Sequence, residues 1–361
     1  MRLTNRVKAR DLSPLLILAG IFAAWLFWLA VSTGYRNTDV SDFQAFYRSG
    51  LAWRSTSTIQ TGLVDRPNLN PPSVVALVFA PLSRLSQAHA YAIWTITGLL
   101  LLAWCLWIIP ASPRAKAWAC VWLGASVPAF WTWHEGQITW LLLPFVTYAW
   151  VLSRRGEFVQ AGVCLAPAIA IKPTLALLAL ALPWPIWLTA GVGSLALSIG
   201  SVAFTGVQPW RDWFALSRTI TWFGNPMNGS VWGLADRFAW SQLDTGIMIA
   251  CVVALLLLIR RLPHDARWIG AVLCATLLSP LGWVGYLAIG LGPVLTLHGV
   301  SRPFRVLLVA SLLPWTVPLL WFGPTPLVKS LYGGVVLLAM LTLVTAHPMA
   351  SPQTSELDEA A

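Results

Sequence analysis

Long apolar runs separated by short polar turns dominate this chain. They cover residues 14–33, 89–109, 117–133, 138–153, 158–171, 173–183, 186–204, 245–259, 268–281, 284–299, 306–322 and 329–346. The mean hydropathy is +0.70 and only 10% of residues are charged, which is more apolar surface than a soluble domain needs. Because backbone hydrogen bonds must be satisfied within each segment in lipid, such runs favour membrane helices. We predict an all-α, polytopic integral membrane protein with about twelve transmembrane helices.

Basic residues predict how the chain is oriented. Residues 1–13 carry four of them ahead of an apolar run that is too long for a signal peptide and lacks an Ala-x-Ala site, which indicates a cytoplasmic N-terminus and an uncleaved anchor. Later basic residues at 114–116, 154–155, 260–267 and 302–305 predict cytoplasmic turns by the positive-inside rule. These assignments agree if the short run 72–83 dips in from outside without crossing. If that run crosses, one other assignment is wrong.

The threading predicts one transmembrane domain, residues 14–346, with outer loops at 35–71 and 205–243. Residues 347–361 are expected to form a disordered cytoplasmic tail. The first outer loop is amphipathic, because Phe43, Phe46 and Tyr47 recur at helical spacing while Arg48 and Arg54 occupy other positions. We expect one or two helices there, lying along the outer interface, and a similar helix at 209–223.

The net charge of +10 does not indicate a nucleic-acid partner, because the basic residues lie in short turns between apolar runs. All five cysteines fall within apolar runs and show no metal-ligand spacing, so they read as hydrophobic residues. The 23 tryptophans mostly lie near segment ends, which is typical of interfacial anchors.

Two carboxylates, Asp39 and Asp42, stand at the outer end of the first run. If the segment is helical, a spacing of three places both on one face. One interpretation is helix capping or a surface pair with a nearby arginine. The other is a general base or metal ligand at the mouth of a membrane cavity, where partial desolvation tunes a carboxylate.

Other polar residues on the predicted outer side are candidates for a site. Lys172 is bounded by apolar residues, so it either snorkels outward or receives an anionic group such as a phosphate. His134 and Glu135 lack a second histidine at ligand spacing, which favours a polar turn over a metal site, and Glu135 and Gln137 are candidates to bind sugar hydroxyls.

Two further stretches of the outer side break regular helix. Asn228 and Ser230 lie in a turn-rich part of the second outer loop, where they form turns or contact substrate. The run from Ser279 to Tyr286 contains Ser-Pro and two glycines, and a helix broken at the membrane boundary is tolerated where it lines a cavity. Because no nucleotide-binding signature is present, any donor must be an activated lipid or the energy must come from an ion gradient.

These stretches together resemble the GT-C glycosyltransferases, and most closely glycosyltransferase family 87, whose known members are polyprenyl-phosphate-mannose-dependent mannosyltransferases. The resemblance runs from about residue 15 to 345 and is carried by ordered blocks: Asp42-Phe43-x-x-Phe46-Tyr47; Asn70-Pro71-Pro72 and Ala80-Pro81-Leu82; Gly136-Gln137, Ala161-Gly162 and Ile171-Lys172-Pro173; Asn228-Gly229-Ser230; and Ser279-Pro280-x-x-Trp283.

The resemblance implies a GT-C-like fold and a polyprenyl-phosphate sugar donor, with a lipid or glycan acceptor and inversion at the anomeric carbon. By motif position Asp42 is the implied general base, with Asp39 as the fallback and Lys172 as the partner of the donor phosphate. Trp283 and Tyr286 are also predicted to contact the substrate. We expect a bacterial-type cytoplasmic (inner) membrane, a periplasmic or extracellular active face and no cofactor; the sequence does not decide whether a metal is needed.

The chain departs from the family at one informative position. The family often has a histidine two residues after the Ser-Pro-x-x-Trp tryptophan, where this chain has Gly285. Arg66 and His134 are candidates to compensate for the lost contact. Two alternative functions stay open, namely a transporter or flippase of lipid-linked sugars and a non-catalytic relative. Transporters spread charges through the bundle, whereas the polar residues here gather on one side, which favours an interfacial enzyme.

Overall fold

The computed structural model describes residues 14–36, 41–59, 67–239, 245–297, 303–304, 306–307, 323 and 325–346. Asp39, Arg66, residues 1–13, most of the predicted run 306–322 and the tail 347–361 lie outside these ranges. Regular structure in the described part of the chain is helical, apart from one isolated bridge between Asn228 and Trp283. The predicted all-α class is therefore confirmed.

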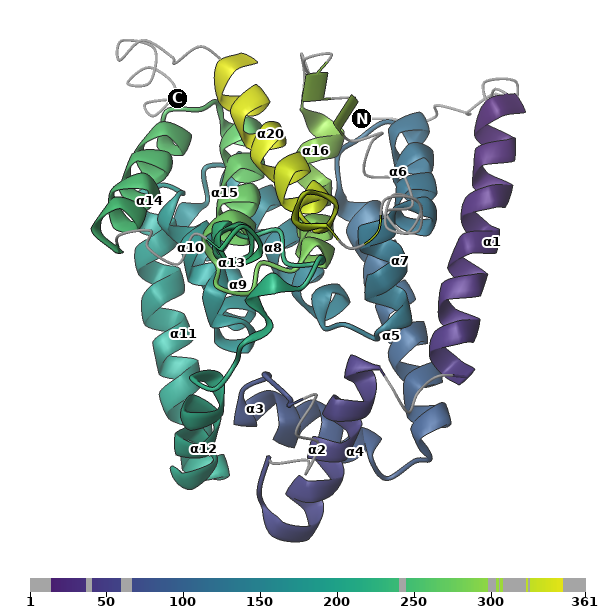
Figure 1. Ribbon diagram of the computed structural model, residues 1–361, viewed down its shortest axis with the longest axis vertical. Helices are drawn as coiled ribbons and strands as arrows, with labels where there is room; N and C mark the ends of the chain where they lie inside the picture. Colours follow the sequence, from purple (N-terminus) through teal and green to yellow (C-terminus); the bar gives the residue numbers. More distant parts are fainter. Residues whose placement is uncertain are drawn as a thin grey trace.

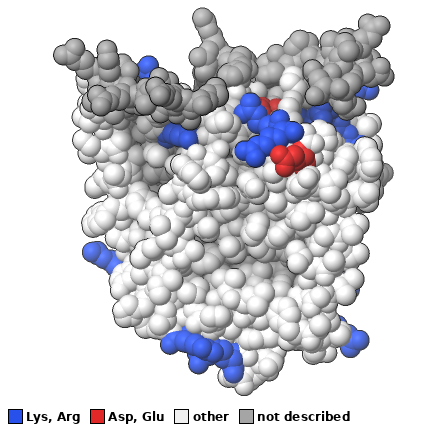
Figure 2. All heavy atoms as spheres, turned by 180° about the vertical axis from the view of Figure 1, so that it is seen from behind, with Lys and Arg blue, Asp and Glu red and all other residues white. Residues whose placement is uncertain are grey.

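Within the described ranges, three helices are long and apolar enough to cross a membrane: α1 (Pro14–Arg36), α5 (Gln87–Ile108) and α11 (Trp184–Thr205). They expose large apolar side chains such as Trp28, Leu100 and Ile199. On the face drawn in Figure 2, lysine and arginine gather mostly toward the two ends, and the belt between them is almost uncharged. An uncharged belt with apolar side chains facing outward is the surface of a membrane protein.

Shorter helices complete the bundle: α6 (Pro113–Ala125), α7 (Val127–His134), α8 (Thr139–Arg154), α9 (Phe158–Ile171), α14 (Thr245–Arg260), α15 (His264–Leu278) and α20 (Leu331–Ala346). The core lies around α8 and α15, whose largest buried side chains are Trp150 and Trp268. The predicted count of about twelve crossings remains a prediction.

Three predicted runs are not single helices. Run 117–133 breaks at Ser126, whose hydroxyl caps α7 by accepting the N–H of Ala129. Run 173–183 begins with Pro173 in the 3-10 helix η4 (Pro173–Leu175) and continues as α10 (Ala176–Leu180). Run 284–299 is the 3-10 helix η6 (Val284–Gly290) followed by the short α16 (Leu291–Thr296). Apolar composition predicted each stretch, but a capping serine, a proline and closely spaced glycines interrupt the helices.

One end of the molecule is a layer of short helices, which Figure 1 shows at the bottom. It contains α2 (Asp42–Thr56), α3 (Pro72–Val74), the π-helix η3 (Val75–Phe79), α4 (Ala80–Leu82) and α12 (Gln208–Ser217). The predicted amphipathic helix in the first outer loop is α2, since Phe43 and Phe46 are buried against Phe79 while Arg48 and Arg54 are exposed. This layer carries the residue at which the candidate site begins, Asp42.

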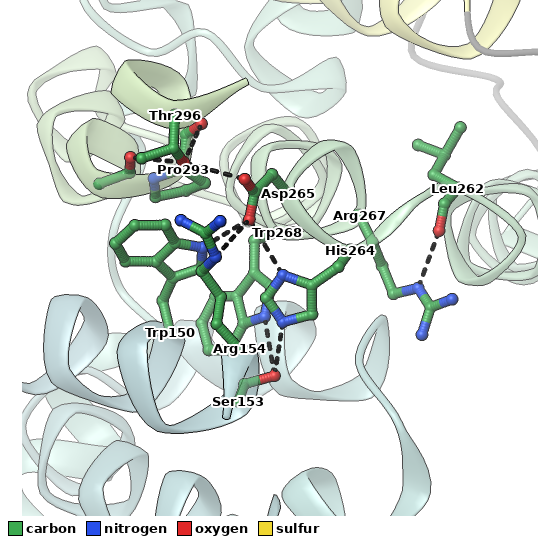
Figure 3. Close-up of polar contacts among 11 residues, drawn as sticks. Trp150, Ser153, Arg154, Leu262, His264, Asp265, Arg267, Trp268, Pro293 and Thr296 are labelled. Carbon is green, nitrogen blue, oxygen red and sulfur yellow. Dashed lines mark hydrogen bonds and ion pairs between the residues drawn. The ribbon is translucent and has the colours of Figure 1, made fainter. Parts of the chain in front are cut away.

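A polar network holds α8, α15 and α16 together at turns that the sequence predicts to be cytoplasmic (Figure 3). Asp265 accepts hydrogen bonds from Trp150 Nε1 at 3.0 Å and Thr296 Oγ1 at 2.9 Å, and its Oδ1 lies 3.8 Å from Arg154 Nε. His264 joins Asp265 Oδ1 at 3.0 Å to Ser153 Oγ at 2.8 Å. Burial opposes ionisation of Asp265, but these hydrogen bonds and the charge of Arg154 outweigh it and lower the pKa of the carboxyl.

Candidate active site

The turn between α7 and α8 receives the N-terminus of α2. Its backbone reverses at Gly136, which has a φ of +62° and packs so closely on Phe43 that a Cβ there would lie 2.8 Å from Phe43 Cβ. The N–H of Asp42 donates to Glu135 Oε2 at 2.9 Å, and the N–H of Phe43 donates to the Glu135 carbonyl at 2.9 Å. Residues 93 positions apart in sequence thus form one structure.

The carboxylate of Asp42 faces the same turn. Gln137 Nε2 donates to Asp42 Oδ2, and the carboxylate is only partly buried. Asp42 lies in the first turn of α2, where the exposed N–H groups and the helix dipole favour a negative charge. Asp42 and Gln137, which the sequence predicts to lie on the same outer side, are thus in direct contact.

Contacts from His134 and from Tyr91 and Trp94 of α5 hold the turn in place. His134 Nδ1 lies 3.3 Å from Glu135 Oε1, and its ring packs against Phe130 and Trp131. From α5, Tyr91 donates to the Trp133 carbonyl at 2.7 Å and Trp94 donates to the Gly136 carbonyl at 2.9 Å. These contacts hold the turn from both sides and place Glu135 and Gln137 next to Asp42.

Lys172 ends α9 on the second side of the candidate site. Its Nζ lies 5.2 Å from the ring centroid of Tyr286, a cation–π contact. Among the residues that the structure describes, no carboxylate is within ion-pair distance of Lys172. The side chain of Lys172 is partly exposed, so an anionic ligand can approach it.

A short chain of contacts connects Lys172 to Asp42. Gly285, next to Tyr286, packs on Thr132 of α7, and a Cβ at Gly285 would lie 2.5 Å from Thr132 Oγ1. The carbonyl of Thr132 accepts the N–H of Gln137 at 3.0 Å. Gln137 in turn holds Asp42. The position where the family often has histidine is thus a close-packing position between the two sides of the candidate site.

Asn228 holds the broken helix near Trp283. Its Nδ2 donates to the Phe223 and Pro280 carbonyls at 3.1 and 3.0 Å, and its Oδ1 accepts the N–H of Gly282 at 2.9 Å and of Ser230 at 3.2 Å. An asparagine amide can make four such bonds, so the protein uses all of them. The backbones of Asn228 and Trp283 also pair as the isolated bridge.

Ser230 has a similar role. It is fully buried, caps α13 (Val231–Arg237) by accepting the N–H of Gly233 at 3.0 Å, and donates to the Pro280 carbonyl at 3.3 Å. The sequence left open whether Asn228 and Ser230 form turns or contact substrate. Their bonding in this structure is that of turn-forming residues.

Sequence reasoning missed Arg237, the last residue of α13. Its Nη1 donates to the Asn225 and Asn228 carbonyls at 2.8 and 3.1 Å, and its Nε donates to Ser330 Oγ at 2.9 Å. Burial lowers the pKa of the guanidinium, and the charge of Asp236 opposes that shift. Arg237 thus connects the Asn228 turn to the start of α20 by hydrogen bonds, and no local sequence pattern predicts this role.

No group of three or more His, Cys, Asp or Glu side chains lies close enough to hold a metal within the described ranges. The candidate residues Asp39 and Arg66 lie outside those ranges.

Comparison with known proteins identifies the family of this chain. No curated protein and no solved structure matches the chain. The model of glycosyltransferase family 87 matches residues 68–282, which is more than half of the chain and includes the His134–Gln137 turn, Lys172 and the Asn228 turn. The chain therefore belongs to glycosyltransferase family 87.

Proposed function

We propose that this protein transfers a hexose from a polyprenyl-phosphate sugar to a hydroxyl of a lipid or glycan acceptor. Mannose is the first sugar to test, because the family resemblance points to it. The observation that carries the proposal is the arrangement around α2, where a partly exposed carboxylate is held by Gln137 on a rigid turn. Family membership supports the reaction class.

Asp42 acts as the general base in this proposal. It accepts the proton of the acceptor hydroxyl as the oxygen attacks the anomeric carbon and the bond from that carbon to the phosphate oxygen breaks. The polyprenyl phosphate leaves with the bonding electron pair, and attack from the opposite face inverts the anomeric carbon. A positioned general base contributes about 10²–10⁴-fold in rate.

Lys172 receives the donor phosphate. An ammonium held over an aromatic ring, with no ion pair to a described carboxylate, is suited to the charge that grows on the leaving phosphate. The prenyl chain lies in the lipid beside the helical bundle, and the layer formed by α2, α3, α4 and α12 lies at the level of the headgroups. We propose that this layer faces the periplasm or the exterior of a bacterial-type inner membrane.

The proposal is tested by transfer of labelled sugar. Purified protein in lipid nanodiscs is given labelled polyprenyl-phosphate sugars and a membrane lipid extract, and the glycosylated products are separated. Wild-type protein is expected to form a new glycosidic bond, and Asp42→Asn to lose at least about 100-fold in rate. Glu157→Gln, a carboxylate-to-amide change in the α8–α9 turn, is the matched control and keeps full activity.

Two results count against the proposal. Full transfer by Asp42→Asn removes the assigned base. Movement of the donor across the membrane without a new glycosidic bond favours a transporter instead.

A further inference from the structure

Two carboxylates meet at the N-terminus of α2, those of Asp42 and Glu135, and both are partly buried. Glu135 uses Oε2 to accept the N–H of Asp42 and has Oε1 at 3.3 Å from His134 Nδ1, so both of its oxygens are engaged. Its side chain is also mostly buried, at 17% exposed. Glu135 is therefore poorly placed to take a proton from an acceptor hydroxyl.

We infer that Glu135 is a positioning residue that holds Asp42 in place and strengthens it as a base. The inference rests on the proposed function, in which Asp42 is that base. Glu135 contacts no reacting atom in this account. It acts on the reaction only through Asp42.

The positioning part follows from hydrogen bonds. Glu135 accepts the N–H of Asp42 with its side chain and the N–H of Phe43 with its carbonyl, both at 2.9 Å. These are two of the N–H groups that a helix N-terminus leaves without intrahelical partners. Together with the Gln137 contact, they fix where α2 begins and which way its first carboxylate points.

The electrostatic part follows from like charge. The N-terminus of α2 favours an ionised Asp42 and so makes it a weak base, whereas the nearby negative charge of Glu135 disfavours ionisation and raises its proton affinity. A base with higher proton affinity removes the hydroxyl proton faster while it stays ionised at working pH.

Other titratable groups near the turn are few among the described residues. His134 contacts Glu135 directly, and Tyr91 of α5 lies within electrostatic reach of Glu135 from behind the turn. Arg36 at the end of α1 and Arg48 on α2 are exposed, so solvent screens their charges. When its imidazole is protonated, His134 is the group best placed to offset the charge of Glu135.

The experiment is a pH profile of transfer with labelled polyprenyl-phosphate sugar. Glu135→Gln keeps an oxygen that accepts the Asp42 N–H but removes the charge, so the acidic limb of the profile moves to lower pH by about one unit. The rate at the plateau falls about threefold, because the base is weaker. His134→Gln replaces a group that offsets the charge of Glu135 when the imidazole is protonated, so we expect the limb to move the other way, to higher pH. Glu157→Gln is the control and leaves the limb in place.

The outcomes separate this inference from the function on which it rests. Variants that unfold are recognised by size-exclusion and thermal scans, and the opposite shifts expected for Glu135→Gln and His134→Gln give two independent tests. Slower transfer with an unmoved limb in both variants, while Asp42→Asn stays inactive, overturns the inference and leaves the proposed function standing. Full transfer by Asp42→Asn overturns the proposed function itself.

Discussion

Gly285 offers a sharp test of the packing that joins the two sides of the candidate site. In Gly285→Ala the new methyl would lie 2.5 Å from Thr132 Oγ1, which is closer than carbon and oxygen approach without a shift. Thr132 has little room to yield, because it is 1% exposed and its hydroxyl donates to the Pro128 carbonyl at 2.8 Å. Either that hydrogen bond breaks or α7 moves away from η6.

The expected cost follows from those two responses. Losing a buried hydrogen bond costs about 1–3 kcal/mol, and overpacking a filled core costs about the same. We therefore expect Gly285→Ala to lower the free energy of unfolding by about 1–3 kcal/mol. Transfer should slow as well, because Thr132 also holds Gln137 through its carbonyl. Histidine, the residue that the family often has there, should cost more than alanine.

A double-mutant cycle isolates the contact. Thr132→Ala removes the oxygen that the new methyl meets, so Gly285→Ala should cost little in the Thr132→Ala background. Stability is measured by thermal unfolding of the detergent-purified protein, and transfer by the labelled-sugar assay. Costs that add, with no coupling between the two positions, would refute the close packing of η6 on α7.

Two further residues, Asp265 and Lys172, can be tested by substitution. Asp265→Asn should destabilise the protein and remove the acid sensitivity of the α8–α15–α16 network. Because folding lowers the pKa of Asp265, its stabilisation is present above the unfolded pKa of about 4 and is lost as the pH falls below that value. Thermal scans across pH 3–7 measure this loss, and an unchanged acid limb in Asp265→Asn would exclude Asp265 as its source. Lys172→Ala should weaken donor binding about 10-fold or more, which is measured as a higher KM for the donor, whereas Lys172→Arg should keep part of the affinity. Equal KM values for wild type and Lys172→Ala would show that Lys172 does not bind the phosphate.

Local composition predicted the helical class and the amphipathic helix of the first outer loop. Apolar runs indicate segments that are buried in lipid or in a protein core, so they predicted the helices α1, α5 and α11 directly. They did not find the break at Ser126 or the changes from 3-10 to α-helix after Leu175 and Gly290, because a hydropathy pattern is the same whether an apolar stretch forms one helix or two.

The sequence singled out candidate residues, but it could not predict how they lie relative to one another. Asp42, Gln137 and Lys172 stood out because polar groups are rare in this chain. The contact between Asp42 and Glu135 was not predictable, because it joins segments 93 residues apart through a turn whose shape depends on Gly136. Arg237 was missed since an arginine in an outer loop resembles any solvated surface charge.

The fate of the family histidine position also needed the structure. The sequence showed only that Gly285 replaces a larger residue. The structure adds that Thr132 occupies the space beside it, so the position serves packing between η6 and α7. A side chain there would press on the helix that leads to the turn holding Asp42.

The most direct test of the shared site is an experimental structure with a non-transferable polyprenyl-phosphate sugar analogue in nanodiscs. We expect the phosphate to lie within about 3 Å of Lys172 Nζ, with the anomeric carbon facing the carboxylate of Asp42. A phosphate bound instead among the basic turns at Arg154 and Arg260, or a sugar that Asp42 cannot reach, would contradict it.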